Sequence, residues 1–127
     1  MGRSIEELDP IIQPLVKAFV ALCADLGHPV RLSCTYRSRR DQQQLFDMGR
    51  SMAIPGRSWH QHRRAFDVYF NKKGDIYDGP WESIGRIGEI MGFEWGGRWK
   101  KLVDKPHFQY TEGQTIDEFI AKEKENG

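Results

Sequence analysis

Long apolar runs are missing from this sequence. No stretch approaches the roughly 20 consecutive apolar residues that a membrane-spanning helix requires. The segment after Met1 is charged and lacks the apolar centre of a secretory signal peptide. We therefore expect no membrane insertion, and synthesis in the cytoplasm without a signal peptide.

An excess of charge of one sign is also missing, because the chain has nineteen basic and eighteen acidic residues. A formal net charge of +1 creates no general field for nucleic acid or an anionic membrane, so we expect neither as a partner. The charges are nevertheless unevenly placed, since seven arginines between Arg37 and Arg64 face only Asp41 and Asp47. This basic stretch indicates either an anionic substrate or an ordinary solvated surface.

Cysteine is scarce, with only Cys23 and Cys34 in the chain. The two do not form a Cys-x-x-Cys pair, which argues against a zinc site built on cysteine. Both lie in segments that we expect to face the core, where free cysteine behaves as a small hydrophobic residue. We predict a structural role for both.

One modest core is what 127 residues with 39% hydrophobic residues support. Repeats and linkers are absent from the sequence, so we expect residues 1–127 to form a single domain, and a monomer. Hydrophobic periodicity and turn residues predict helices over 9–27, 38–49 and 78–92, strands over 30–35, 64–70 and 106–110, and loops over 50–59 and 93–99. A capping box over 115–118 predicts a final polar helix. Gly85 and Gly88, inside the third helix, predict close packing there.

Two histidines and two aspartates carry the chemistry of the chain. Imidazole and carboxylate groups are suitable donors for a catalytic zinc ion, which needs three protein ligands and one open position for water. His60, Asp67 and His107 supply such a set, with Asp67 on the strand face opposite Phe66. Asp104 lies three residues before His107, close enough to take a proton from zinc-activated water and pass it to a leaving amine.

Each of these residues also has an ordinary structural interpretation. A histidine beside aromatic residues often satisfies a local hydrogen bond, and an aspartate near a proline often forms a turn. Arg37 is suited to bind a substrate carboxylate or a developing oxyanion, but an ordinary surface arginine is the alternative. Gln43, in the helix that follows, is a candidate to line the same side of the site. Trp59, Trp95 and Trp99 indicate either a groove for an extended substrate or core aromatic residues.

The motifs in these segments resemble a known family. They are Tyr36-Arg37-Ser38, Ser58-x-His60, Ala65-x-Asp67, Trp95-Gly96-Gly97-x-Trp99-Lys100 and Asp104-x-Pro106-His107-Phe108, and they span about Val30 to Tyr110. In order and spacing they resemble the zinc D-Ala-D-Ala carboxypeptidase and L-alanyl-D-glutamate endopeptidase family, and in particular the endopeptidase branch found among bacteriophage endolysins.

The resemblance implies an α+β fold of the hedgehog/DD-peptidase type, in which helices flank a small antiparallel sheet that carries the zinc site. It also implies one catalytic Zn²⁺ held by His60, Asp67 and His107, with Asp104 as the acid/base. Arg37 and Ser58 match substrate-site positions, and we add Gln43 and Trp95 as candidates. The implied substrate is the peptidoglycan stem peptide, cut between L-Ala and D-Glu.

This sequence departs from the family pattern at three positions. Arg63 and Thr35 stand where glycine is usual, and Arg98 stands where aspartate is common. If the first glycine serves a positive φ angle, Arg63 requires an unusual turn. No zinc ligand is lost, but the identity of the cleaved bond is affected.

The leading hypothesis is a zinc peptidoglycan endopeptidase from a phage or prophage, which reaches the wall through a holin or a similar route. A D-Ala-D-Ala or L,D-carboxypeptidase is the alternative within the same class. A zinc-containing domain that binds the cell wall without catalysis is the alternative from another class. Asp104 favours an enzyme, because a structural zinc ion needs no proton acceptor.

Overall fold

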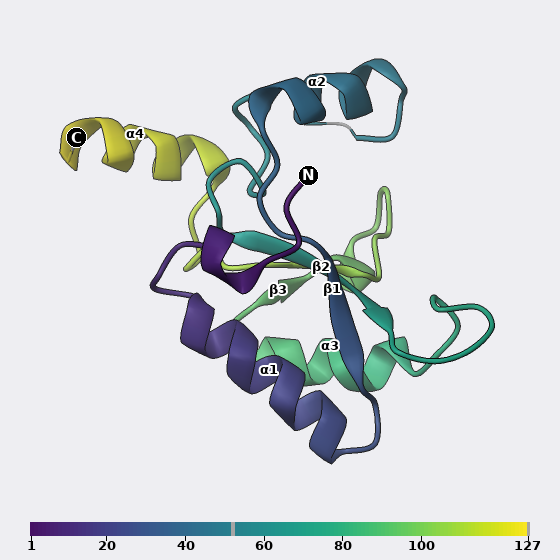
Figure 1. The fold of residues 1–127 in the computed structure, drawn as a ribbon. Coiled ribbons are helices and arrows are strands. Elements are labelled where there is room, and N and C mark those ends of the chain that lie inside the picture. Colours follow the sequence, from purple (N-terminus) through teal and green to yellow (C-terminus); the bar gives the residue numbers. More distant parts are fainter. Residues whose placement is uncertain (52, 127) are drawn as a thin grey trace.

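A four-stranded antiparallel sheet lies at the centre of the computed structural model, which describes residues 1–51 and 53–126. The order of its strands is β1-β2-β4-β3 (Figure 1). In chain order the elements are a 3-10 turn (Ile5–Glu7), α1 (Gln13–Asp25), β1 (Val30–Cys34), α2 (Arg39–Asp47), β2 (Ala65–Phe70), α3 (Trp81–Ile90), β3 (Glu94–Trp95), a second 3-10 turn (Gly96–Arg98), β4 (His107–Gln109) and α4 (Ile116–Asn126). The predicted α+β class, with helices flanking a small antiparallel sheet, is confirmed.

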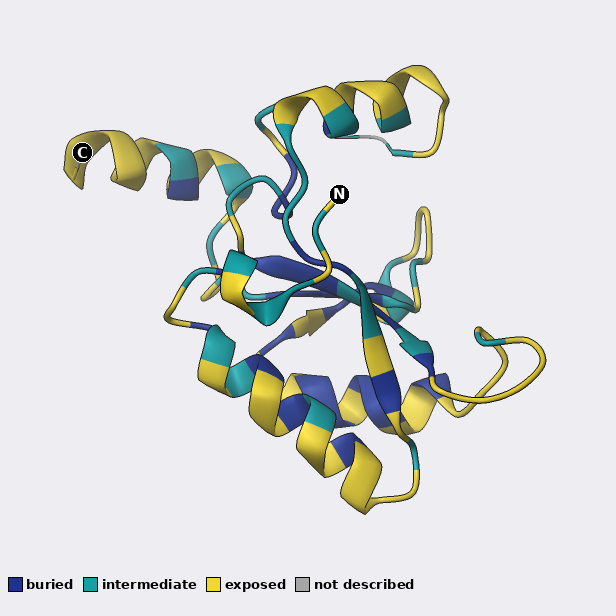
Figure 2. Ribbon diagram, in the orientation of Figure 1, coloured by how far each residue is buried: buried dark blue, intermediate teal, exposed yellow. Residues whose placement is uncertain are grey.

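The helices lie on opposite sides of the sheet. α1 and α3 pack on one face, whereas α2 and α4 lie on the other side (Figure 1). The main core lies on the side of α1 and α3, and buried residues of both helices are dark blue in Figure 2. Within the described residues no helix has the length and apolar character required to cross a bilayer.

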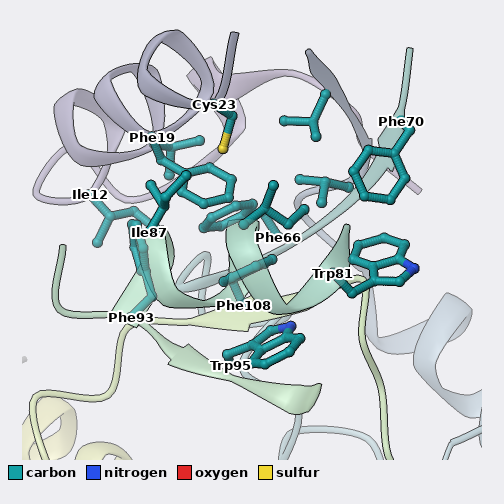
Figure 3. Close-up of a cluster of buried hydrophobic side chains, with 14 of the residues drawn as sticks. Ile12, Phe19, Cys23, Phe66, Phe70, Trp81, Ile87, Phe93, Trp95 and Phe108 are labelled. Atoms are coloured by element: carbon teal, nitrogen blue, oxygen red, sulfur yellow. The ribbon is translucent and has the colours of Figure 1, made fainter. Parts of the chain in front are cut away.

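Aromatic rings fill the space between the sheet and α1 and α3. Phe66 of β2 stacks on Phe108 of β4 with ring centroids 5.4 Å apart, and Phe19 of α1 packs on both (Figure 3). Burying each ring favours folding by about 2–3 kcal/mol. Because side chains alternate along a strand, this burial turns the intervening residues of β2 and β4 toward the opposite face.

The predicted close packing of α3 is confirmed at both of its glycines. A Cβ atom at Gly85 would overlap the ring of Trp95, and one at Gly88 would overlap Phe108. Glycine lowers helix stability by about 1 kcal/mol relative to alanine. Here that cost is offset by the close approach of the helix to the sheet.

Two element boundaries differ from the predictions. Residues 9–12 form a turn closed on the carbonyl of Asp9, and α1 begins at Gln13 with Pro14 in its first turn, where a missing N–H costs nothing. The segment 93–99, predicted as a loop, contains β3 and a 3-10 turn. Two residues carry no detectable period; their pairing with β4 makes them a strand.

Candidate active site

The antiparallel pairing of β2 with β4 places Asp67 directly opposite His107. Phe66 and Val68 are fully buried in the core, so Asp67 points to the other face of the sheet, as predicted. Its Oδ1 atom lies 3.0 Å from Nδ1 of His107. Two of the predicted zinc ligands therefore meet through strand register alone.

His60 reaches the same carboxylate from the loop before β2. Its Nδ1 atom is 2.8 Å from the carbonyl oxygen of Thr35, which can only accept, so Nδ1 carries the proton. Nε2 is thereby left as the nitrogen that faces Asp67, 3.3 Å from its Oδ1. Metal-binding histidines commonly fix their free nitrogen in this way.

The donor set fits a metal ion. Nε2 of His60 is buried and makes no hydrogen bond, although buried polar atoms normally have a partner. Nε2 of His60 and Nδ1 of His107 both lie within 3.3 Å of one carboxylate oxygen of Asp67. Two imidazole nitrogens and a carboxylate are the ligands that zinc accepts in catalytic sites.

Strong electrostatic coupling joins His60 to Asp67. Burial alone would lower the pKa of His60, but the charge of Asp67 and the hydrogen bonds to Asp67 and Cys34 together outweigh it and raise that pKa to about 9. Burial would likewise raise the pKa of Asp67, yet the charge of His60 and the hydrogen bond from His107 lower it well below its ordinary value. Without a metal, a proton on His60 is therefore what balances the Asp67 carboxylate.

Asp104 lies beside this pair of histidines. Ligand atoms of Asp67, Asp104 and His107 all fall within 4.8 Å of one another. Burial raises the pKa of Asp104; the charge of His107 opposes the rise, and the charge of Asp67 adds to it. A half-buried carboxyl with a raised pKa is suited to proton transfer near neutral pH.

The loop that carries Asp104 is held by backbone contacts. The amide of Asp104 donates to the carbonyl of Gly96 at 3.0 Å, and the amide of His107 donates to the carbonyl of Asp104 at 3.1 Å. The indole of Trp95 donates to the carbonyl of Lys105 at 2.7 Å. Trp95 is only 3% exposed, so the structure does not bring it to a substrate surface as predicted; it positions the loop.

Arg37 lies next to the histidines, with Nη2 3.9 Å from Oδ2 of Asp67. Its Nη1 atom donates to Oε1 of Gln42 at 2.9 Å, and Gln42 is fully buried. Gln43, the predicted neighbour, is exposed and donates to Asp47 instead. The structure does not bring Gln43 to this wall, because adjacent residues of a helix point about 100° apart.

Ser58 positions the first histidine. Its hydroxyl accepts from the amide of His60 at 3.3 Å, and the side chain is mostly buried. A contact between Ser58 and substrate stays a prediction. The next histidine along the chain, His62, has its Nε2 2.9 Å from the carbonyl oxygen of Gly56 and packs against Phe119.

The three tryptophans do not form one groove. Trp59 packs with Phe119 of α4, and Trp95 belongs to the main core. Trp99 is partly exposed, and its ring centroid lies 5.2 Å from that of His107. Trp99 alone of the three lies against the predicted zinc ligands.

Sequence reasoning missed the position of Cys34 at the site. Its sulfur lies 3.8 Å from Nδ1 of His60, and its ligand atom falls within 4.8 Å of those of His60 and Asp67. Cys34 pairs with Asp67 only because the register shifts between Leu32 and Cys34. A bulge of this kind leaves no signal in the sequence pattern.

The departures at Arg63 and Thr35 have structural explanations. Arg63 has a φ of 62°, so the backbone conformation suited to glycine is kept by an arginine. Its guanidinium lies 4.0 Å from the centroid of the Tyr36 ring and donates to the carbonyl of Glu7 at 2.9 Å. Thr35 supplies the carbonyl that holds His60.

Arg98, the third departure, lies on the surface over α3. It pairs with Glu82 at 2.9 Å and with Glu89 at 3.1 Å. It therefore ties the 3-10 turn after β3 to α3, away from the histidines.

Known proteins are similar to this chain in sequence and fold. A family model described as D-alanyl-D-alanine carboxypeptidase matches residues 53–110. The peptidoglycan L-alanyl-D-glutamate endopeptidase CwlK of Bacillus subtilis (strain 168) is 33% identical, over 81% of this chain and 73% of its own length. An L-alanyl-D-glutamate peptidase of Listeria phage A118 is 31% identical over 73% of this chain but only 34% of its own length. The crystal structure of the Serratia marcescens L-Ala D-Glu endopeptidase ChiX has a TM-score of 0.64 at 29% identity, covering 84% of this chain and 83% of that one. The chain therefore belongs to the M15 peptidase family.

Proposed function

We propose that this protein is a zinc-dependent peptidoglycan endopeptidase that hydrolyses the L-Ala–D-Glu bond of stem peptides. One observation carries the proposal: two histidine nitrogens converge on Oδ1 of Asp67, one of them buried without a hydrogen bond, with the carboxyl of Asp104 beside them. The activity named for the Bacillus and Serratia relatives supports the choice of bond.

The zinc ligands in this proposal are Nε2 of His60, a carboxylate oxygen of Asp67 and Nδ1 of His107. Zinc held by such a set lowers the pKa of a bound water to about 7 and polarises a carbonyl. The carbonyl of Thr35 keeps the proton of His60 on the nitrogen that faces away from Asp67. The chain thus presents Nε2 of His60 as the nitrogen that a metal can bind once it displaces the proton there.

Asp104 manages the proton in this reaction. Its carboxylate takes a proton from the attacking water and returns it to the nitrogen of the leaving D-Glu. Burial, which raises the pKa of Asp104, favours both halves of this task. Arg37, braced by Gln42, supplies a positive charge for a substrate carboxylate or for the developing oxyanion.

The test is digestion of purified peptidoglycan by zinc-loaded protein, followed by mass spectrometry of the muropeptides. We expect stems cut between L-Ala and D-Glu, new amino-terminal D-Glu, and loss of activity with a chelator that zinc restores. Asp104→Asn, loaded with zinc to the same extent, is the matched inactive control. Intact muropeptides after treatment with the zinc-loaded wild-type protein would overturn the proposal in favour of a non-catalytic wall-binding domain.

A carboxypeptidase that removes terminal D-Ala is the second candidate. It is favoured by the description of the family model that matches residues 53–110. The same digestion separates the two activities, because a carboxypeptidase releases free D-alanine and leaves the L-Ala–D-Glu bond intact.

A lysis role in phage biology is the finer part of the proposal. The similarity to a Listeria phage A118 peptidase supports it, together with a holin-type route from the host cytoplasm to the wall. Added protein should clear cells whose outer membrane has been permeabilised. Expression inside the host should cause lysis only when a holin is expressed with it; lysis without one would contradict this route.

A further inference from the structure

His107 and Gln109 lie on the same face of β4. Phe108 between them points into the core, so the two polar side chains turn together toward the site. Nε2 of His107 lies 2.7 Å from Oε1 of Gln109. Gln109 is only 8% exposed, so water has little access with which to compete for this contact.

The orientation of the Gln109 amide is set by a carboxylate on the neighbouring strand. Glu94 of β3 pairs directly with Gln109, and its carboxylate accepts a hydrogen bond from the Gln109 amide nitrogen. An ionised carboxylate can only accept, so the NH₂ end of the amide must face Glu94. The oxygen end must therefore face His107.

That orientation determines which nitrogen of His107 can bind a metal. An amide oxygen can only accept, so the hydrogen bond to Gln109 places a proton on Nε2 of His107. Nδ1, 3.0 Å from Oδ1 of Asp67, is then the nitrogen on which a metal ion can replace the hydrogen bond to Asp67. With the amide reversed, its NH₂ group would face Nε2 and favour the proton on Nδ1, where it would block the metal.

We propose that Glu94 and Gln109 are positioning residues for the metal site, acting as a relay from carboxylate to amide to the imidazole of His107. This inference rests on the proposed zinc function and extends it to two residues outside the ligand set. The proposal also assigns a role to β3. This strand of two residues is anchored in the core by Trp95 and places Glu94 opposite Gln109.

The two histidines are held by different means. His60 donates to a backbone carbonyl, that of Thr35, which no side-chain substitution removes. His107 depends on two side chains, and so its orientation can be tested by mutation. Removal of such partners typically weakens metal binding about 10- to 100-fold.

Zinc affinity, measured by competition with a chromophoric chelator, tests the relay without reference to activity. We expect Gln109→Leu to weaken zinc binding about 10- to 100-fold, and Glu94→Gln to have a smaller effect, because its amide oxygen still accepts from Gln109. Gln44→Leu and Glu123→Gln, which change exposed residues of α2 and α4, are matched controls and should bind zinc like the wild type.

An exchange of the two side chains separates positioning from simple packing. Gln109→Glu alone places two carboxylates together and should weaken zinc binding. In the double variant Glu94→Gln/Gln109→Glu, the new carboxylate accepts from both His107 and the new amide, so affinity should return to within about threefold of the wild type. An exchange variant as weak as Gln109→Leu would overturn the relay.

Nuclear magnetic resonance of the zinc-loaded wild type supplies the second readout. The proton on Nε2 of His107 should give a slowly exchanging signal with Nδ1 bound to the metal, and Gln109→Leu should lose that protection. A wild type that binds no zinc would contradict the proposed function. Zinc binding in the wild type that Gln109→Leu leaves unchanged would contradict the relay alone.

Discussion

The backbones of Gly96 and Asp104 are in direct contact. The amide of Asp104 donates to the carbonyl of Gly96 at 3.0 Å, and a Cβ atom at Gly96 would overlap the carbonyl oxygen of Asp104. The position of the proposed acid/base therefore depends on a buried residue without a side chain, eleven positions before His107.

Gly96→Ala should lower kcat while leaving zinc binding intact. The added methyl group must push the backbone of Asp104 away, and a displacement of about 1 Å in a catalytic group costs about 100-fold in rate. Peptide hydrolysis with zinc occupancy measured in parallel checks this. Lys101→Ala, in the exposed part of the same loop, is the control; equal kcat for Gly96→Ala and wild type would show that the loop absorbs the methyl group.

Asp104→Asn should remove hydrolysis and spare the metal. An amide cannot accept the proton from the attacking water, and a positioned general acid/base contributes about 10²- to 10⁴-fold. Because Asp104 is not among the proposed ligands, zinc should bind to the variant as tightly as to the wild type, within a few-fold. A variant that loses zinc together with activity would instead make Asp104 a ligand.

Two of the proposed zinc ligands, Asp67 and His107, could be brought together from the sequence because their spacing follows the strands. Asp67 alternates with Phe66 and Val68, and the short strand at His107 pairs with it in register. The face that Asp67 occupies could therefore be predicted from period two alone. His60 comes from a turn that has no period, and it was inferred from its residue type and then matched by the motif Ser58-x-His60.

The neighbours of the ligands were not accessible in the same way. Gln42 and Gln43 differ only in helix phase, and one residue decides which of them braces Arg37. Cys34 reaches His60 through a bulge, and Glu94 reaches Gln109 through a strand of two residues. Such contacts depend on tertiary register, which local sequence patterns do not encode.

Zinc binding should weaken as the pH falls below about 9, the value to which the charge of Asp67 raises the pKa of His60 against the effect of burial. A metal must displace the proton on His60, so binding should release protons below that pH. Calorimetry of zinc binding in buffers of different ionisation enthalpy measures the number released. Zinc affinity that is flat from pH 6.5 to 9 would contradict the coupling.

The stability of the metal-free protein should change in the same range. Because the pKa of His60 rises on folding from 6.5 to about 9, its stabilisation is fully present below pH 6.5 and is lost as the pH rises through 9. The unfolding free energy should then fall on the order of 1–3 kcal/mol. Urea titrations with chelator measure this. Zinc-loaded protein is the control and should show no such fall.

Arg63→Ala should destabilise the protein more than Arg63→Gly does. Both variants lose the guanidinium contacts with Tyr36 and Glu7, worth about 1–2 kcal/mol together. Alanine keeps the strain of the positive φ angle, about 1 kcal/mol, whereas glycine relieves it. Urea unfolding should therefore place Arg63→Gly about 1 kcal/mol above Arg63→Ala. Equal stability of the two variants would mean that the turn relaxes once the arginine is removed.

In either case Tyr36 and Glu7 lose their link to the turn that carries His60, so zinc affinity measured on both variants also shows whether that link supports the site.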